Sequence, residues 1–178
     1  MERRSAFEGD LVRLTAISED DAELLNPMFS HEDVLETLIV PFPQSSEGFR
    51  EWVRMQREDD TQINFRIDTL DGGTPIGACG LANLVPRSRQ GMVGIWIGKP
   101  HWGDGYGTDA VRTLCHYGFR FMNLHRIWLT VLDINPAAAR AYEKAGFVRE
   151  GTMREDHFIR GRWTDTHLMA VLEQDFVN

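Results

Sequence analysis

The chain has 178 residues, a formal net charge of -8 and a hydrophobic content of 42%, which suits one domain, residues 1–178, whose core needs no disulfide or metal staples. The acidic balance argues against nonspecific binding to DNA and weakly favours cationic substrates. No apolar run approaches the roughly 20 residues of a membrane span, and none follows Met1-Glu2-Arg3-Arg4, so we expect neither a membrane segment nor a secretory signal.

Hydrophobic periodicity and turn residues predict a strand followed by helices in the first third of the chain. Ser18 is expected to cap a first helix, Pro41-Phe42-Pro43 to end a second, and Ser45-Ser46-Glu47 to begin a third. The predicted elements are a strand over 10–16, helices over 18–26 and 31–38, and a helix from 45 that carries Phe49, Trp52, Val53 and Met55.

The rest of the chain is predicted to hold most of a sheet. A hairpin turns at Asp71-Gly72-Gly73, and Gly146 stops the last helix. The predicted elements are strands over 63–70, 75–84 and 92–97, a helix from 105 to about 122, a strand over 126–132, a helix over 136–145, and strands over 147–154 and 163–172 joined by a turn at 157–162. This order predicts a mixed α/β fold with one mostly antiparallel sheet.

A glycine-rich segment stands before the long helix. Trp102-Gly103-Asp104-Gly105-Tyr106-Gly107-Thr108 has glycine at three alternate positions. Glycine has no Cβ, so the backbone can approach a ligand closely. The first N–H groups of a helix have no intrahelical partner and lie at the positive end of its dipole. The segment therefore predicts a cradle for a phosphate or pyrophosphate.

Three known phosphate-binding loops are alternative interpretations of this segment. A fourth is an ordinary tight turn between strand and helix, with no ligand. The Walker loop needs a lysine after its glycines, and none is present. The dinucleotide fingerprint needs glycine where Thr108 stands. The acyl-CoA loop, Gln/Arg-x-x-Gly-x-Gly/Ala, matches Trp102-x-x-Gly105-x-Gly107 in its glycines, with an indole in place of the first side chain.

A second segment favours the acyl-CoA loop. Residues 133–147, which run from Asp133 through Asn135 and Tyr142 to Phe147, resemble the N-x-x-(S/A)-x-x-x-(Y/L)-x-K-x-G-F motif of the GCN5-related N-acetyltransferase (GNAT) superfamily. The order of the two motifs agrees with that superfamily. The ending Gly161-Arg162-Trp163-Thr164-Asp165 looks like the subgroup of ribosomal-protein N-acetyltransferases, the Rim type. Members of that subgroup acetylate quite different amines.

The resemblance implies a GNAT-like single domain with about seven strands, helices on both faces, and acetyl-CoA as co-substrate without a metal. It implies that a strand bulge, for which Gly94 is suited, parts two strands and frees backbone groups for pantetheine. The cofactor-binding residues implied are Gly103, Asp104, Gly105, Tyr106, Gly107 and Thr108 for pyrophosphate, and Ile95, Trp96, Ile97 and Asn135 for pantetheine.

Two helix positions have both a structural and a functional interpretation. Asn135 precedes Pro136, so helix capping explains the pair without a ligand, and that role is compatible with a pantetheine contact. The resemblance implies that Tyr142 is the catalytic general acid, because a phenol can protonate the departing CoA thiolate. Packing against the sheet is the alternative for Tyr142. Arg140 and Lys144 are either a solvated helix face or contacts to CoA phosphates.

The general base is not assigned. The resemblance implies a glutamate where this chain has Met92. Acetyl transfer needs a neutral amine, so a proton has to leave directly or through water. Five other titratable residues near strand ends are more typical of a solvated surface: Asp133, Glu150, Asp156, His101 and His157.

We therefore expect an acetyl-CoA-dependent N-acetyltransferase in which a primary amine attacks directly within a ternary complex. Cys79 and Cys115 are expected to be core residues in a reducing cytoplasm, not acyl carriers. The acceptor is left open among a ribosomal-protein N-terminus, a polyamine, an aminoglycoside and another small amine. A CoA-binding regulatory module and a nucleotide-phosphate enzyme are the alternatives. A homodimer is expected from the resemblance.

Overall fold

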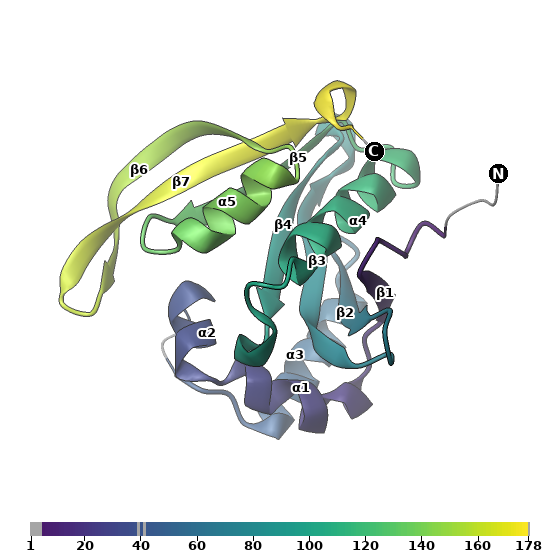
Figure 1. Ribbon diagram of the computed structural model, residues 1–178, viewed down its shortest axis with the longest axis vertical. Helices are drawn as coiled ribbons and strands as arrows, with labels where there is room; N and C mark the ends of the chain where they lie inside the picture. The colour runs from purple at the N-terminus through teal and green to yellow at the C-terminus, as the bar shows by residue number, and fades with distance from the viewer. Residues whose placement is uncertain (1–4, 39, 41, 178) are drawn as a thin grey trace.

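The computed structural model describes residues 5–38, 40 and 42–177, so the Met1-Glu2-Arg3-Arg4 segment and Pro41 lie outside the described residues. A seven-stranded sheet in the order β1-β2-β3-β4-β5-β7-β6 forms the body of the molecule (Figure 1). The strands are β1 (Val12–Ala16), β2 (Ile63–Thr69), β3 (Pro75–Val85), β4 (Gln90–Ile97), β5 (Arg126–Leu132), β6 (Val148–Ile159) and β7 (Arg162–Leu172). Only β4 and β5 pair in parallel, which confirms the predicted mixed, mostly antiparallel sheet.

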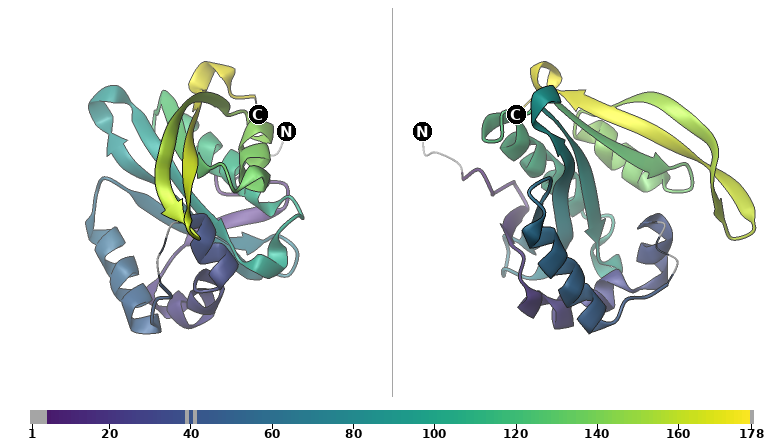
Figure 2. Two further views of the ribbon diagram at one scale, coloured as in Figure 1. Left: turned by 90° about the vertical axis from the view of Figure 1, so that its left-hand side faces the viewer. Right: turned by 180° about the vertical axis from the view of Figure 1, so that it is seen from behind.

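Helices cover both faces of the sheet, as expected (Figure 2). The helices are α1 (Ala22–Phe29), α2 (Glu32–Leu38), α3 (Ser46–Glu58), α4 (Tyr106–Arg120) and α5 (Pro136–Lys144). Helices α4 and α5 pack on the larger core, which holds Val93 and Ile97 of β4. Helices α1, α2 and α3 pack on the opposite face around Trp96. This division follows from the alternation of side chains along β4.

The C-terminal hairpin is longer than its sequence predicts. The turn expected at 157–162 is wrong, because β6 continues to Ile159 and β7 begins at Arg162. The rings of Phe158 and Trp163 pair across the strands, with centroids 5.3 Å apart, and extend the ladder to the tip. A 2.6 Å ion pair between Arg160 and Glu36 joins this tip to α2.

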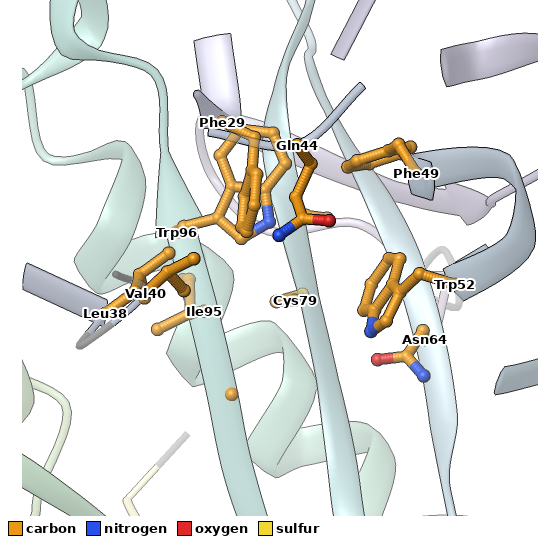
Figure 3. Close-up of a pocket in the computed structure, with 12 residues that line it drawn as sticks. Phe29, Leu38, Val40, Gln44, Phe49, Trp52, Asn64, Cys79, Ile95 and Trp96 are labelled. Atoms are coloured by element: carbon orange, nitrogen blue, oxygen red, sulfur yellow. The ribbon is translucent and has the colours of Figure 1, made fainter. Parts of the chain in front are cut away.

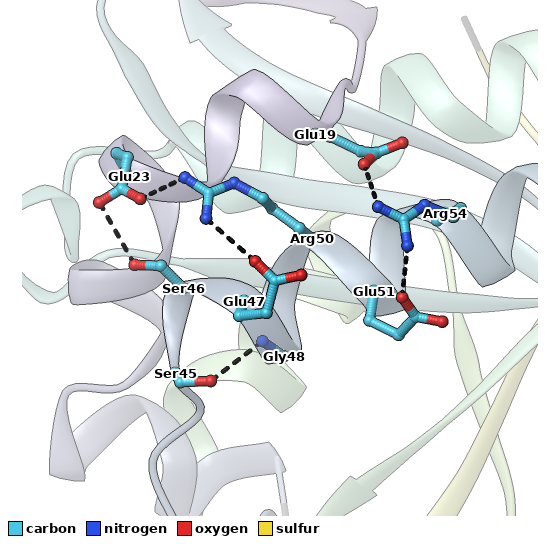
Figure 4. Close-up of polar contacts among 9 residues, drawn as sticks. All are labelled: Glu19, Glu23, Ser45, Ser46, Glu47, Gly48, Arg50, Glu51 and Arg54. Carbon is cyan, nitrogen blue, oxygen red and sulfur yellow. Dashed lines mark hydrogen bonds and ion pairs between the residues drawn. The ribbon is translucent and has the colours of Figure 1, made fainter.

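Helix α3 is held against the first helices by two arginines on its exposed side (Figure 4). Arg50 pairs with Glu23 of α1, and Arg54 pairs with Glu19 at 2.7 Å just before α1. The Ser45 side chain caps α3 by accepting a hydrogen bond from the Gly48 N–H at 3.0 Å. Such exposed pairs each stabilise the fold little, and the side of α3 that faces the sheet is the side with its buried residues. That side carries Phe49.

Candidate active site

The sheet opens between its two parallel strands. Strand β5 pairs with β4 only from Gln90 to Met92, whereas β4 stays in register with β3 from Met92 to Ile97. Among the described residues, the C-terminal half of β4 therefore has no strand partner on its β5 side. The bulge expected at Gly94 is wrong: the β3–β4 register is continuous there and shifts only between Ala82 and Val85. Divergence of β5, not an extra residue in β4, makes the gap.

The backbone of β4 points into this gap at alternate residues. Gly98 N–H donates to the Ile76 carbonyl at 2.8 Å, so the groups that face β3 are those of Gly98, Trp96 and Gly94. The N–H and C=O groups of Ile95 and Ile97 then face β5. The Trp102 indole N–H donates to the Ile97 carbonyl at 2.6 Å, which agrees with this orientation. The gap is thus lined by hydrogen-bonding groups that the ladder does not use.

The glycine loop lies at the end of β4, directly before α4. Gly103 and Gly105 have φ of 94° and 88°, in the left-handed region, and Gly105 is the N-cap residue of α4. A Cβ built on Gly103 meets no atom within 4 Å, and one on Gly107 meets only Ile97 Cγ1 at 3.9 Å. The first-turn N–H groups of α4 are therefore approachable, and the predicted anion cradle fits this geometry.

The far side of the loop is fixed by a buried carboxylate. Asp109 of α4 accepts hydrogen bonds from the N–H groups of Asp10, Leu11 and Val12 at 3.0, 2.7 and 3.0 Å. These bonds hold the start of β1 behind the loop, where Leu11 Cδ1 would lie 3.4 Å from a Cβ on Gly105. The acid is thereby directed away from the open side of the cradle.

A second helix N-terminus lies at the same edge of the sheet. Strands β4 and β5 are parallel, so α4 and α5 both begin beyond their carboxyl ends, where ligands bind in open α/β sheets. Asn135 is the N-cap residue of α5, and its Oδ1 accepts a hydrogen bond from the Ala138 N–H at 3.1 Å. The capping role of Asn135 is confirmed. Its Nδ2 makes no hydrogen bond to another described residue and can serve a ligand.

Tyr142 lies two turns along α5 from Asn135. Its ring packs against Phe147, with centroids 6.1 Å apart, at the margin of the larger core. Loss of water around the phenol raises the pKa of Tyr142 to about 12, so the hydroxyl keeps its proton at neutral pH. The position of the Tyr142 ring supports a packing role, and its protonated hydroxyl is still able to donate a proton.

The two cysteines are confirmed as free and buried. Burial alone raises the pKa of Cys79, and burial followed by the neighbouring Cys79 raises the pKa of Cys115. Because the thiolate is the nucleophilic form of cysteine, neither side chain is suited to carry an acyl group.

A cavity of about 420 Å³ opens on the other face of β4, under α1, α2 and α3 (Figure 3). Ten of its twelve lining residues are apolar or glycine, and none of the twelve carries a charge. The aromatic members are Phe29, Phe49, Trp52 and Trp96, and the others are Leu38, Val40, Ala78, Cys79, Gly94 and Ile95, with Gln44 and Asn64 as the polar pair. The cavity therefore shares Ile95 and Trp96 with the gap strand.

Sequence comparison identifies the family of the chain. A sequence model of the acetyltransferase (GNAT) domain matches residues 12–148, which include the glycine loop, Asn135 and Tyr142. The chain belongs to the GNAT acetyltransferase family. It is accordingly an enzyme of the acetyl-CoA-dependent N-acetyltransferase class.

Two curated relatives and one solved structure illustrate which members of the family this GNAT protein resembles. It is 26% identical to the spermidine N(1)-acetyltransferase of Vibrio cholerae over 165 residues, 93% of this chain and 95% of the relative. It is 28% identical to a putative ribosomal N-acetyltransferase of Bacillus subtilis over 138 residues, 75% and 74% of the two chains. The crystal structure of the Vibrio cholerae spermidine enzyme with CoA and spermine superposes with a TM-score of 0.86, 26% identity, and 94% and 98% coverage.

The charged candidates considered for proton transfer in this GNAT protein lie outside the cavity lining. Glu150 is paired with Arg126, whose hydrogen bond lowers the pKa of that carboxyl. Asp156 lies 2.9 Å from His157 on the hairpin. His101 is near the Tyr106 ring, 6.2 Å between centroids. Each has a local structural explanation, and no base is assigned.

The remaining polar candidates lie around α5. Arg140 and Lys144 are on its exposed side. Asp133 lines a second, shallower hollow of about 390 Å³ at the α5 N-terminus, together with Thr164. Thr164 Oγ1 is buried and has no hydrogen-bond partner among the described residues. This hollow adds polar atoms beside the Asn135 cap.

Sequence reasoning identified the cradle and the α5 motif and expected an acceptor cleft roofed by the N-terminal helices, but it did not identify the residues that line the cavity. The cavity residues come from α1, the end of α2 and the segment after it, α3 and three strands, and all but Gln44 and Asn64 resemble ordinary core residues in their own segments. Asn64, a polar residue within the otherwise largely apolar start of β2, is the one local sign that was available.

Within the described residues no helix is long and apolar enough to cross a membrane. In the same part of the chain, His, Cys, Asp and Glu side chains do not gather in threes around a point where a metal ion could bind.

Proposed function

We propose that the protein transfers the acetyl group of acetyl-CoA directly to a primary amine held in the same ternary complex. The observation that carries this proposal is that the cradle and the cavity both border the part of β4 that β5 leaves unpaired. The cradle approaches Ile97 at its end, and the cavity is lined by Gly94, Ile95 and Trp96. In this arrangement the pyrophosphate binds the N–H groups of residues 103–108, and pantetheine extends along the backbone of Ile95 and Ile97 to Asn135. Trp96 contributes its side chain on the acceptor side.

The chemical step is a simple exchange of bonds. The amine nitrogen attacks the thioester carbon, the C–N bond forms, and the C–S bond breaks to release CoA as its thiol. The nitrogen loses one proton to water, and the sulfur gains one. Backbone N–H groups of the β4 edge are suited to polarise the thioester carbonyl, and most of the acceleration comes from this and from orientation.

Tyr142 is proposed as the donor of the proton that the sulfur gains. A pKa of about 12 makes the phenol a weak acid. A thiolate released into an equally shielded space is also more basic than its usual pKa of about 8.5. Burial raises the pKa of the Cys79 thiol in the same direction. The two groups therefore stay matched as donor and acceptor.

We also propose that the protein belongs to the Rim-type subgroup. The relatives include a putative ribosomal N-acetyltransferase, which supports this assignment, but they equally include spermidine N-acetyltransferases. Identities of 28% to the putative ribosomal enzyme and 26% to the spermidine enzyme do not separate the two. The acceptor has to be argued from the cavity. The homodimer and the cytoplasmic location stay predictions.

A thiol-release assay with purified protein, acetyl-CoA and a panel of amines tests transfer. The panel holds a ribosomal-protein N-terminal peptide, a polyamine, an aminoglycoside and small aromatic amines. Release with at least one amine, together with the acetylated product by mass spectrometry, is expected. Binding of acetyl-CoA without release from any amine would instead indicate the CoA-binding regulatory module. Affinity for ATP or NAD above that for CoA would indicate the nucleotide alternative.

A further inference from the structure

The acceptor cavity is built for an apolar group. We infer that the acceptor is a weakly basic primary amine carried on an aromatic or bulky apolar group, and not a polycation; this inference rests on the proposed transferase function. Four aromatic rings line the cavity in series: Phe29 lies 5.4 Å from Trp96 and 5.9 Å from Phe49, and Phe49 lies 5.4 Å from Trp52, between centroids. A cavity of about 420 Å³ suits one small organic molecule.

The charge around the cavity argues against a polyamine. None of the twelve lining residues is charged. Four acids on the neighbouring elements are already paired: Glu19 and Glu23 with the arginines of α3, and Asp21 and Asp68 with Arg66 at 2.6 and 2.8 Å. An ammonium group that enters an apolar site without a counter-charge loses its hydration uncompensated. A polyamine carries several such groups, so each would add to this cost.

The two polar side chains can orient an amine but cannot take its proton. The Gln44 main chain is fixed, because its carbonyl accepts from Asn26 Nδ2 at 2.9 Å and its N–H donates to Ser30 Oγ at 3.2 Å. Figure 3 shows the Gln44 amide directed toward the space between the rings and the Asn64 amide below the Trp52 ring. Asn64 Nδ2 donates to Gln56 at 2.8 Å, which leaves its Oδ1 as an acceptor.

A site without a base selects an amine that is already neutral in solution. An α-amino group has a pKa of about 7.8, whereas an alkylamine such as lysine has about 10.4, so the neutral fraction at neutral pH differs by several hundredfold. Amines with an α-carbonyl, in a small amino-acid amide or at a peptide N-terminus, meet this condition. The aromatic rings then require a large apolar group next to the amine.

Three amines test separately whether the site requires a weakly basic amine and whether it requires an aromatic group. Phenylalanine amide and glycine amide share a weakly basic amine and differ in the ring, whereas spermidine is strongly basic and has no ring. We expect kcat/KM for phenylalanine amide to exceed that for each of the others by about tenfold or more, the effect of burying one aromatic group. A peptide that begins with Phe, assayed beside phenylalanine amide, distinguishes a protein N-terminus from a small molecule as the source.

The pH dependence of kcat/KM should be set by the pKa of the amine substrate. The neutral fraction grows as pH rises through the amine's own pKa and then levels off. Among apolar amines of graded basicity, the midpoint of the kcat/KM profile should therefore move with each amine's pKa. A midpoint that stays at one pH for all amines would assign the proton transfer to a group of the enzyme and would contradict a site without a base.

Two variants test the cavity itself. Gly94 lies on the cavity floor, where an added Cβ meets no atom within 4 Å, so Gly94→Val should fill the space and lower kcat/KM for phenylalanine amide about tenfold while glycine amide is spared. Gly151→Val makes the same change in β6, also in open space, and is the matched control. Asn64→Asp adds a carboxylate to the cavity and should raise the spermidine rate relative to phenylalanine amide at least severalfold.

The outcomes separate this inference from the function on which it rests. If spermidine or glycine amide is the best acceptor of the wild-type protein, the inference is wrong and the transferase function stands. If Gly94→Val changes both amides equally, the cavity is not the acceptor site. If acetyl-CoA binds and no amine releases thiol, the transferase function fails, and the inference fails with it.

Discussion

Among single residues, removal of the Tyr142 hydroxyl tests the proposed mechanism most directly. Tyr142→Phe keeps the ring that packs on Phe147 and removes the proton donor. General acid catalysis contributes about 10²–10⁴ in rate, so kcat should fall by that order with little change in acetyl-CoA affinity. Stopped-flow or steady-state thiol release measures the first quantity and calorimetry the second. A rate within about twofold of wild type would leave Tyr142 as a packing residue.

The pH dependence of kcat provides a second measurement on the same residue. A phenol is a general acid only while protonated, so its contribution is lost as pH rises through its pKa. Burial raises the pKa of Tyr142 to about 12, which puts that loss beyond the usual alkaline range. With a saturating amine, kcat should not fall between pH 8 and about 10. A decline near pH 10 would mean that the phenol titrates as in water.

Asp109 is the residue on which the position of the glycine loop depends. Asp109→Asn leaves one acceptor oxygen where two serve three N–H groups, and the new amide N–H₂ faces donors. We expect the free energy of unfolding to fall by about 2 kcal/mol, the cost of buried donors without partners. Urea denaturation of this variant measures the change. Asp60→Asn, at an exposed position, is the control and should change stability little. Equal stability of both variants would show that the three bonds contribute nothing net.

At the scale of elements, the cradle depends on a backbone that only glycine adopts readily. Gly105 has φ of 88°, and a Cβ there would lie 3.4 Å from Leu11 Cδ1. Gly105→Val must therefore rearrange the loop, because a β-branched residue is strongly disfavoured at positive φ. We expect the variant to lose the rise in melting temperature that acetyl-CoA gives the wild type by binding the native state.

The hairpin turn supplies the matched control for Gly105→Val. Gly161 has φ of 78° and no atom within 4 Å of an added Cβ, so Gly161→Val carries a similar backbone strain far from the cradle. Both variants should melt at a lower temperature than wild type, but only Gly161→Val should still respond to acetyl-CoA. A full response in Gly105→Val would exclude the loop as the binding site.

The elements that the sequence predicts well are those with a buried face. The strand predicted over 126–132 coincides with β5, whose side chains alternate between the core and the surface at its start. Strand β6 is exposed along almost all of its length, so its residues carry no alternating pattern, and the sequence predicts a turn over its last three residues. Periodicity indicates an element only where one of its faces is buried.

The parts of the candidate site also differ in how well the sequence predicts them. The cradle and the Asn135–Tyr142 helix are continuous segments, so a motif can identify them. The acceptor cavity is assembled from residues such as Phe29 and Trp96, which are 67 positions apart in the sequence, and only the fold brings them together. The gap beside β4 is expected only from the family resemblance, because it comes from the direction that β5 takes after Trp128, the residue paired with Met92.

At the scale of the whole molecule, β6 forms one edge of the sheet. The strand order ends at β6, so the outer backbone groups of that strand have no partner strand within the described chain. Large apolar side chains are exposed on this hairpin: Val148 at 63%, Phe158 at 62% and Trp163 at 59%. An exposed edge with apolar side chains is a surface on which a second strand can pair. The hairpin is therefore the place where we expect the homodimer to form.

Sedimentation velocity at tens of micromolar tests this arrangement. Wild type should sediment as a species of twice the 20.4 kDa chain mass, because pairing of two copies would cover the exposed edge and its rings. Phe158→Glu places a charge among those rings and should give the monomer. Met55→Glu is the matched control, since Met55 is also 62% exposed but lies on α3, and it should remain dimeric. A wild type that sediments as a single chain would rule out the dimer. A dimer that persists in Phe158→Glu and dissociates in Met55→Glu would place the contact on the α3 side of the molecule.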